Sequence, residues 1–272
     1  MNLFKQRQAI LHLRTWCLRF SALYILKLTS LESKKCCASK FGKEAKMSNR
    51  QKFERDLTVL LSKLTSDTEK EVENKLNMLK DWLIKLQKEN VVKINHSVME
   101  LVCAKYLIQK GYEVTLEYPL NQILTCDLFA IKGYGNLIVE IETGFIPPEN
   151  ALAPLTYTSA RLASKIIRYS SFAGKFALGV PPHYILPFPP ALAKPPRNRS
   201  DQEIGQIKKL CDAYYQKPPV TLEGIRNARM QEIYIVDVDR VKVQEIDPEA
   251  YLKRAMQKGM VFEYMPPEVK GQ

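Results

Sequence analysis

Cysteine and histidine are scarce in this 272-residue chain, which contains six cysteines and three histidines. No two cysteines have the Cys-x-x-Cys spacing of a zinc site, and His12, His96 and His183 do not complete such a site with them. Cys103 and Cys126 lie in apolar runs, which predicts buried, reduced thiols and a cytoplasmic protein. The sequence therefore argues against a zinc-binding domain.

Long apolar segments and phosphate-binding loops are also missing. No run approaches the roughly 20 apolar residues that a membrane span needs, and no secretory signal with a small-residue cleavage site is present. The absence of a glycine-rich phosphate loop and of a nucleophile elbow argues against a nucleotidase or an esterase. We therefore expect a protein without a membrane partner.

Positive charge is abundant but unevenly distributed. The net charge is +12, and residues 1–46 contribute +8 of it because ten Lys and Arg residues face only Glu32 and Glu44, which leaves +4 for residues 47–272. The main part of the chain is thus only mildly basic, and its total charge does not by itself indicate nucleic-acid binding. Two explanations of the basic leader 1–46 remain open: a presequence, disordered or not, or a start that truly lies at Met47.

Apolar periodicity predicts a helical extension followed by an α/β core. Two helical stripes between residues 49 and 90 predict a helical hairpin within an extension at 47–93, packed on the core or on a second subunit of a homodimer. Residues 94–110 predict a third helix that ends at Gly111. The core at 94–180 then continues with expected strands at 113–120, 125–131 and 136–143, a helix at 157–172 and a buried strand at 176–180.

Proline marks the next boundary. Residues 181–196 hold seven of the sixteen prolines, which predicts a stiff surface loop extending over 181–199. Ser200 and Glu203 form a capping box for a helix, a strand is expected at 232–239, and Pro248 opens a last short helix. With residues 200–272 completing the core, the predicted fold class is α/β, in which helices flank a mixed central sheet in the order α-β-β-β-α-β.

Acidic residues in the central strands give the strongest functional signal. Side chains alternate along 136–143, so Glu140 and Glu142 share one face of an apolar strand, which is costly unless they bind something. A type II′ turn at Gly133-Tyr134 would place Asp127 opposite Glu140, with about 5 Å between their Cβ atoms. Carboxylates at that separation predict a Mg²⁺ or Mn²⁺ site for metal-assisted hydrolysis.

Two helices supply further candidates. Glu100 lies in an apolar setting on helix 94–110 as an outer or second metal contact, whereas His96, one turn earlier, is expected to be a core or capping residue. On helix 157–172, Arg161, Lys165 and Arg168 form a basic stripe opposite an apolar face. Such a stripe indicates either contacts to phosphate or a simple solvated face.

These residues resemble the PD-(D/E)XK nuclease superfamily, which has a restriction-endonuclease-like fold, and are most similar to archaeal Holliday-junction resolvases and related small nucleases. The resemblance covers about residues 97–180 and rests on Glu100 with the helix ending at Gly111, on Cys126-Asp127-Leu128 and on Val139-Glu140-Ile141-Glu142. It implies metal-dependent endonucleolytic hydrolysis of DNA, including branched or single-stranded DNA, in repair or recombination.

The resemblance also implies roles for individual residues. Its catalytic set comprises four acids and one cation: Glu100, Asp127, Glu140, Glu142 and Lys165. The implied metal ligands are Asp127, Glu140 and Glu142. Contacts to nucleic acid would come from Arg161, Lys165 and Arg168.

One departure from the family pattern keeps an alternative open. The family usually has a lysine where this chain has Glu142, and Lys165 is expected to replace it. Some active members of the family carry a glutamate at that position, so the change alone does not imply inactivity. The alternative is an inactive nuclease-fold protein that binds DNA or acts as an assembly subunit. Convergence of Asp127, Glu140 and Glu142 in a cleft edged by Lys165 would favour the nuclease, whereas Glu142 paired with an arginine in a closed core would argue against it.

Overall fold

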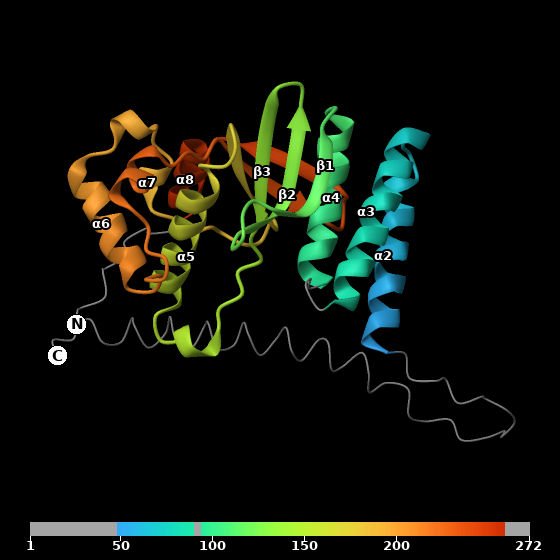
Figure 1. Ribbon diagram of the computed structural model, residues 1–272, viewed down its shortest axis with the longest axis horizontal. Coiled ribbons are helices and arrows are strands. Elements are labelled where there is room, and N and C mark those ends of the chain that lie inside the picture. The colour runs from blue at the N-terminus through green and yellow to red at the C-terminus, as the bar shows by residue number, and fades with distance from the viewer. Residues whose placement is uncertain (1–47, 90–93, 259–272) are drawn as a thin grey trace, which may run out of the picture. The chain divides into compact units, whose positions relative to one another are not determined.

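The computed structural model describes residues 48–89 and 94–258. All of them belong to the second of two units, Met47–Gln272. Helices flank a six-stranded mixed sheet in this unit, so the predicted α/β class is confirmed (Figure 1). Within the described ranges, every helix is too short or too polar to cross a membrane.

The strands follow one another across the sheet in chain order. The first three pair antiparallel: β1 (Glu113–Pro119), β2 (Thr125–Lys132) and β3 (Gly135–Ile141). The next two run parallel to β3, and the last returns antiparallel: β4 (Lys175–Val180), β5 (Glu232–Asp237) and β6 (Lys242–Ile246). Because of these directions, the β1–β2 connection and the carboxyl ends of β3, β4 and β5 lie at one end of the sheet.

The predicted hairpin between β2 and β3 is confirmed. Lys132 pairs with Gly135 and Leu128 with Val139, which is the register that a turn at Gly133-Tyr134 imposes. Gly133 has a φ of 58°. Tyr134 does not share this positive φ, and that combination is the one a type II′ turn requires.

Three helices lie on one side of the sheet, with α4 packed on the strands and α2 packed on the other two helices: α2 (Asn49–Thr65), α3 (Lys70–Lys88) and α4 (Ile94–Gln109). The apolar stripes of α2 and α3 pack into the same buried cluster as α4, so the helical hairpin lies on the core. On α3, Trp82 Nε1 donates a hydrogen bond to the Leu116 carbonyl oxygen at 3.1 Å, and Lys75 Nζ lies 2.7 Å from Glu113 Oε1. These contacts with β1 cover the edge of the sheet, where an exposed strand would invite pairing with another chain.

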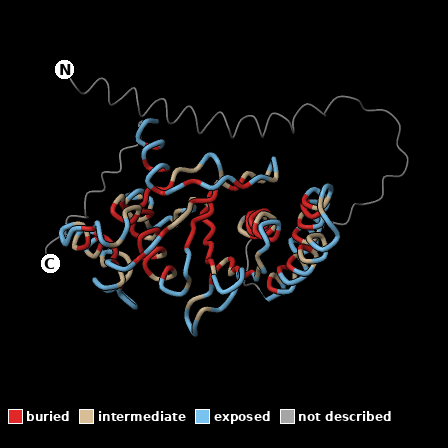
Figure 2. Tube along the Cα trace, turned by 90° about the horizontal axis from the view of Figure 1, so that it is seen from above, coloured by how far each residue is buried: buried red, intermediate tan, exposed pale blue. Residues whose placement is uncertain are grey.

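The other face carries the second buried cluster, contributed largely by α5 (Pro154–Tyr169), α6 (Asp201–Asp212), α7 (Leu222–Asn227) and α8 (Pro248–Gln257). Figure 2 shows buried residues concentrated along the strands between these two helical layers. The predicted capping box of Ser200 and Glu203 is confirmed, as is the start of the last helix at Pro248. The sequence did not predict α7 or β6.

The proline-rich segment is not the predicted surface loop. Leu186, Phe188 and Leu192 are fully buried in the second cluster, and the segment forms two short 3₁₀ helices, η2 (Pro190–Leu192) and η3 (Pro196–Asn198). Proline has no N–H group, so a proline-rich backbone leaves few donors unpaired when it is buried. High proline content therefore excluded an α-helix and a strand here without excluding burial.

Candidate active site

Strand β3 delivers two acids to the face that α5 covers. Leu137, Val139 and Ile141 belong to the cluster on the α4 side, whereas Ile138 belongs to the cluster on the α5 side. Glu140, and Glu142 just beyond the strand, face the same way as Ile138 and are 1% and 3% exposed. The predicted alternation along this strand is therefore confirmed.

Lys165 of α5 lies among the acids. Its Nζ atom is 2.8 Å from Glu140 Oε2, 2.8 Å from Glu142 Oε1 and 4.0 Å from Asp127 Oδ2. Burial acts to lower the pKa of Lys165, but these carboxylates outweigh it and the pKa is raised well above its usual value. Burial raises the pKa of Glu140 to about 8, although the charge of Lys165 opposes this shift.

Arg161 holds Glu142 from a second direction. Its Nη2 atom lies 2.6 Å from Glu142 Oε2, and its Nη1 donates to the Phe145 carbonyl oxygen at 2.8 Å. Lys165 thus lies among the converging acids, as the first discriminating arrangement requires, but Glu140 and Glu142 are buried and Glu142 is paired with an arginine, as in the second. The basic stripe on α5 is not a solvated face at Lys165.

Asp127 occupies a point where two strands change faces. Leu116 and Leu128 contribute to the cluster on the α4 side. Tyr118 and Cys126 each lie two residues from one of these leucines, so regular alternation would place them on the same face. Instead, Tyr118 stacks on Phe129, which packs on the α5 side, and Cys126 belongs to the buried cluster on that side. Strands β1 and β2 therefore reverse their faces together, at the register position of Glu117 and Asp127.

Side chains bridge β2 and β3 where the strands diverge. Backbone pairing ends at Leu128 with Val139, one position before Asp127 would pair with Glu140. In its place, the Asp127 N–H donates to Glu140 Oε1 at 3.1 Å, and the Ile141 N–H donates to Asp127 Oδ2 at 2.6 Å. Asp127 and Glu140 are thereby fixed relative to each other.

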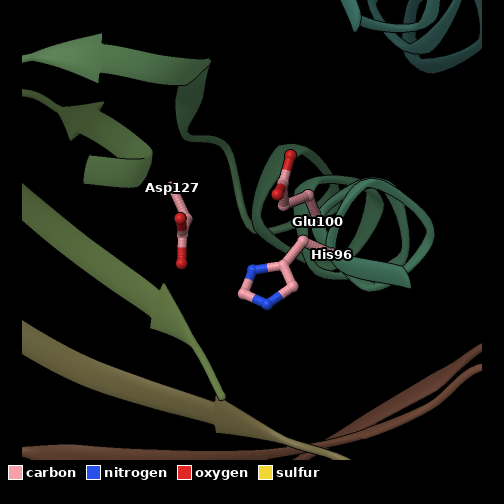
Figure 3. A group of neighbouring side chains, drawn as sticks. All are labelled: His96, Glu100 and Asp127. Atoms are coloured by element: carbon pink, nitrogen blue, oxygen red, sulfur yellow. The ribbon is translucent and has the colours of Figure 1, made fainter. Parts of the chain in front are cut away.

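On the α4 side, Asp127 meets His96 and Glu100. One ligand atom from each of these three residues lies within 4.8 Å of the others. Figure 3 shows His96 and Glu100 on the same helix, with Asp127 facing them from the sheet. His96 was expected to be a core or capping residue; its placement beside two carboxylates adds it to the candidate site.

Glu100 is the least satisfied of these groups. It is fully buried, and neither of its carboxylate oxygens has a hydrogen-bond partner among the described residues. Burial, together with the charges of Asp127 and Glu117, raises the pKa of Glu100 well above its usual value. A buried carboxyl group with no partner is costly, and a bound cation would remove this cost.

The residues fit a divalent cation on the α4 side of Asp127. Oxygen atoms of Glu100 and Asp127 suit Mg²⁺ or Mn²⁺, and the imidazole of His96 adds a nitrogen ligand of the kind that transition-metal ions accept. Glu140 and Glu142, by contrast, already face Lys165 and Arg161. Of the three ligands that the sequence indicated, the structure places Asp127 in this cluster and groups Glu140 and Glu142 with the two cations.

Sequence reasoning missed Glu117 and placed Arg168 at the site. Burial and the charge of Asp127 raise the pKa of Glu117 to about 7, so this acid lies in the electrostatic environment of the site. The sequence of its strand gave no signal, because Glu113, Thr115 and Glu117 form an ordinary alternating pattern with the apolar residues between them. Arg168 instead donates from Nη2 to the Pro218 carbonyl oxygen and lines a separate cavity of about 750 Å³ with Arg229.

No family model, curated protein or solved structure matches the chain in comparisons with known proteins.

Proposed function

We propose that this chain is a divalent-metal-dependent nuclease that hydrolyses phosphodiester bonds in DNA, and that its core has the restriction-endonuclease-like arrangement. One observation carries the proposal: Asp127 connects the unsatisfied Glu100 on α4 to Lys165 on α5. A carboxylate shared between a candidate metal centre and a cation is the arrangement needed at a reacting phosphate.

His96, Glu100 and Asp127 would hold the ion, with Asp127 as the ligand common to both halves of the site. Bound there, the ion would polarise a phosphoryl oxygen and lower the pKa of an attacking water. Glu140 fixes Asp127 through its backbone N–H and is itself held by Lys165. Lys165 takes the part of the family's lysine by balancing negative charge near the scissile phosphate.

The ligand set indicated by the sequence is a second arrangement of the same chemistry. Asp127, Glu140 and Glu142 would share an ion if Lys165 left the position where its Nζ is 2.8 Å from both glutamates. The two ligand sets can be told apart by substitution, because one includes His96 and the other includes Glu140.

A second candidate function is a DNA-binding or assembly subunit with an inactive nuclease fold. It is favoured by Arg161 and Lys165, which neutralise Glu140 and Glu142 inside the protein. The unpaired Glu100 favours the nuclease, because a site without an ion gains nothing from burying this carboxyl group. The proposal also includes single-stranded or branched DNA as the substrate, a homodimeric state and a cytoplasmic location.

Cleavage by the full chain tests the proposal. Labelled single-stranded, duplex, flap and four-way-junction DNA are incubated with the protein in Mg²⁺, Mn²⁺ or EDTA. We expect metal-dependent cleavage that Asp127→Asn reduces by at least about 100-fold, since both candidate ligand sets lose their shared carboxylate. Asp212→Asn is the matched control, because Asp212 pairs with Lys208 on α6 and contacts no acid of the site.

Calorimetry with Mn²⁺ then separates the alternatives. Mn²⁺ binding that is weakened more by His96→Asn than by Glu140→Gln identifies the set on the α4 side; the reverse order identifies the set on the strands. DNA binding without cleavage in either metal would replace the nuclease by the non-catalytic subunit.

A further inference from the structure

Glu117 has a backbone conformation that a glutamate rarely adopts. Its φ is +51°, in the left-handed region, although it lies within strand β1. Val241, in the turn between β5 and β6, is the other non-glycine residue with positive φ in the described ranges. A left-handed residue in a turn is common, but one in the middle of a paired strand needs a separate reason.

The strained residue coincides with the reversal of the two strands. Leu116 pairs with Leu128 and Tyr118 with Cys126, so Glu117 is opposite Asp127, but this pair itself is not formed. The backbone of Glu117 thus belongs to the change of face that directs Asp127 toward α4. Glycine would adopt this conformation without strain, so the shape of the strand alone does not require a glutamate.

The surroundings of Glu117 indicate what its carboxylate does. Its charge acts on Asp127, Lys165 and Glu100, which are the residues around the proposed ion. Five carboxylates gather here against two cations, Lys165 and Arg161. The unpartnered and fully buried Glu100 is an independent sign that positive charge from a ligand belongs among them.

We propose that Glu117 is a further residue of the cation site, which holds a water ligand of the ion bound at His96, Glu100 and Asp127. The inference rests on the proposed metal centre. Glu117 lies outside the group whose ligand atoms are within 4.8 Å of one another, and Mg²⁺ and Mn²⁺ sites usually keep several waters for such second contacts. The left-handed backbone is retained because it brings this carboxylate to the ion.

Two substitutions separate the carboxylate from the backbone. Glu117→Gln keeps the strained conformation and removes the charge, whereas Glu117→Gly removes both. By calorimetry on the full chain, we expect each to weaken Mn²⁺ binding by about 10–100-fold, as the loss of outer contacts to a metal does. In EDTA, Glu117→Gly should raise the thermal midpoint by about 2–4 °C more than Glu117→Gln does, because only the glycine relieves the strain.

Val241→Gly is the matched control for strain away from the site. It removes a second left-handed residue and should leave the Kd for Mn²⁺ within about twofold of the original. If the unaltered chain binds Mn²⁺ and Glu117→Gln binds it equally well, the role of Glu117 is overturned while the metal centre stands. If the unaltered chain binds no Mn²⁺, the metal centre fails and this inference fails with it.

Discussion

Arg199 and Lys165 are both cations inside the protein, but their partners differ in kind. Arg199 is 5% exposed, and its three donor nitrogens all donate to backbone carbonyl oxygens around the proline-rich segment, those of Ala191, Leu192, Lys194, Ile225 and Arg226. Lys165 instead faces the carboxylates of Glu140, Glu142 and Asp127. One region satisfies a charge with neutral groups, whereas the other gathers more charges than it balances.

The difference separates a structural use of buried charge from a functional one. Around Arg199, donors and acceptors are matched, so the interaction fixes a segment that has few N–H groups of its own. At the acidic site, Glu100 has no partner and Glu117 is strained, both of which lower stability. Residues that lower the stability of the fold in this way are expected where a ligand is bound.

Loss of Arg199 should produce the largest effect. Arg199→Met keeps an apolar stem but leaves the carbonyl oxygens of the proline-rich segment and α7 without their donor. We expect the free energy of unfolding to fall by about 3–5 kcal/mol, measured by urea denaturation.

Arg226→Met is the control for this substitution. Arg226 lies on α7, whose carbonyl oxygens Arg199 contacts, but its own side chain is 53% exposed and pairs with Asp201 at the surface. A change within about 0.5 kcal/mol is expected for such a pair. If Arg199→Met changed the free energy of unfolding equally little, the carbonyl contacts would not be what holds the proline-rich segment. Arg199 would then no longer be an example of a buried charge with a structural role.

Replacing Glu100 should change stability in the opposite direction. Glu100→Gln keeps the shape of the side chain and removes a carboxyl group whose pKa is raised by burial and by Asp127 and Glu117. In EDTA at pH 7 we expect the free energy of unfolding to rise by about 1–3 kcal/mol, because the buried group no longer has to be neutralised.

The same variant should lose its response to metal. Binding of Mn²⁺ at about 100 times its Kd would stabilise the unaltered chain by about 2.7 kcal/mol, and Glu100→Gln should reduce this gain. A destabilised Glu100→Gln would show that the carboxyl group has a structural partner, and the acidic region would then resemble that around Arg199.

The sequence predicted the parts of this comparison that depend on regular alternation. The turn at Gly133-Tyr134 determined the register of β2 and β3, and alternation gave the shared face of Glu140 and Glu142. Alternation could not predict the reversal at Glu117 and Asp127, because it assumes that a strand keeps its faces. The sequence already placed Glu100 beside Asp127 as an outer or second metal contact, whereas the meeting of Asp127 with His96 follows from that reversal and was missed.

Tertiary packing also decided which basic residues reach the acids. Helical spacing placed Arg161, Lys165 and Arg168 on one stripe of α5. The helix packs on α6 and α7 as well as toward the sheet, so residues of the same stripe have different neighbours. Lys165 and Arg161 reach the carboxylates, whereas Arg168 contacts the Pro218 carbonyl oxygen. Spacing alone defines a stripe and does not say what covers each part of it.

The smallest expected effect is the contribution of Glu117 to pH dependence. Burial and Asp127 raise the pKa of Glu117 to about 7, so the folded protein binds this proton more tightly than the unfolded chain does. Stability must then fall as pH rises from about 4.5 through 7, since a raised carboxyl pKa favours the folded state only at low pH. Glu100 and Glu140 add to this fall, and Lys165 opposes it at Glu117 and Glu140.

Comparison of two variants isolates the share of Glu117. In EDTA, Glu117→Gln should reduce the loss of unfolding free energy between pH 5 and pH 7 by about 1 kcal/mol, measured by urea denaturation at each pH. Glu113→Gln should leave the slope unchanged, because Glu113 lies on the same strand but is exposed and paired with Lys75. Equal slopes for both variants would mean that water screens Glu117 from Asp127, and the strain at Glu117 would then need a cause other than this group of acids.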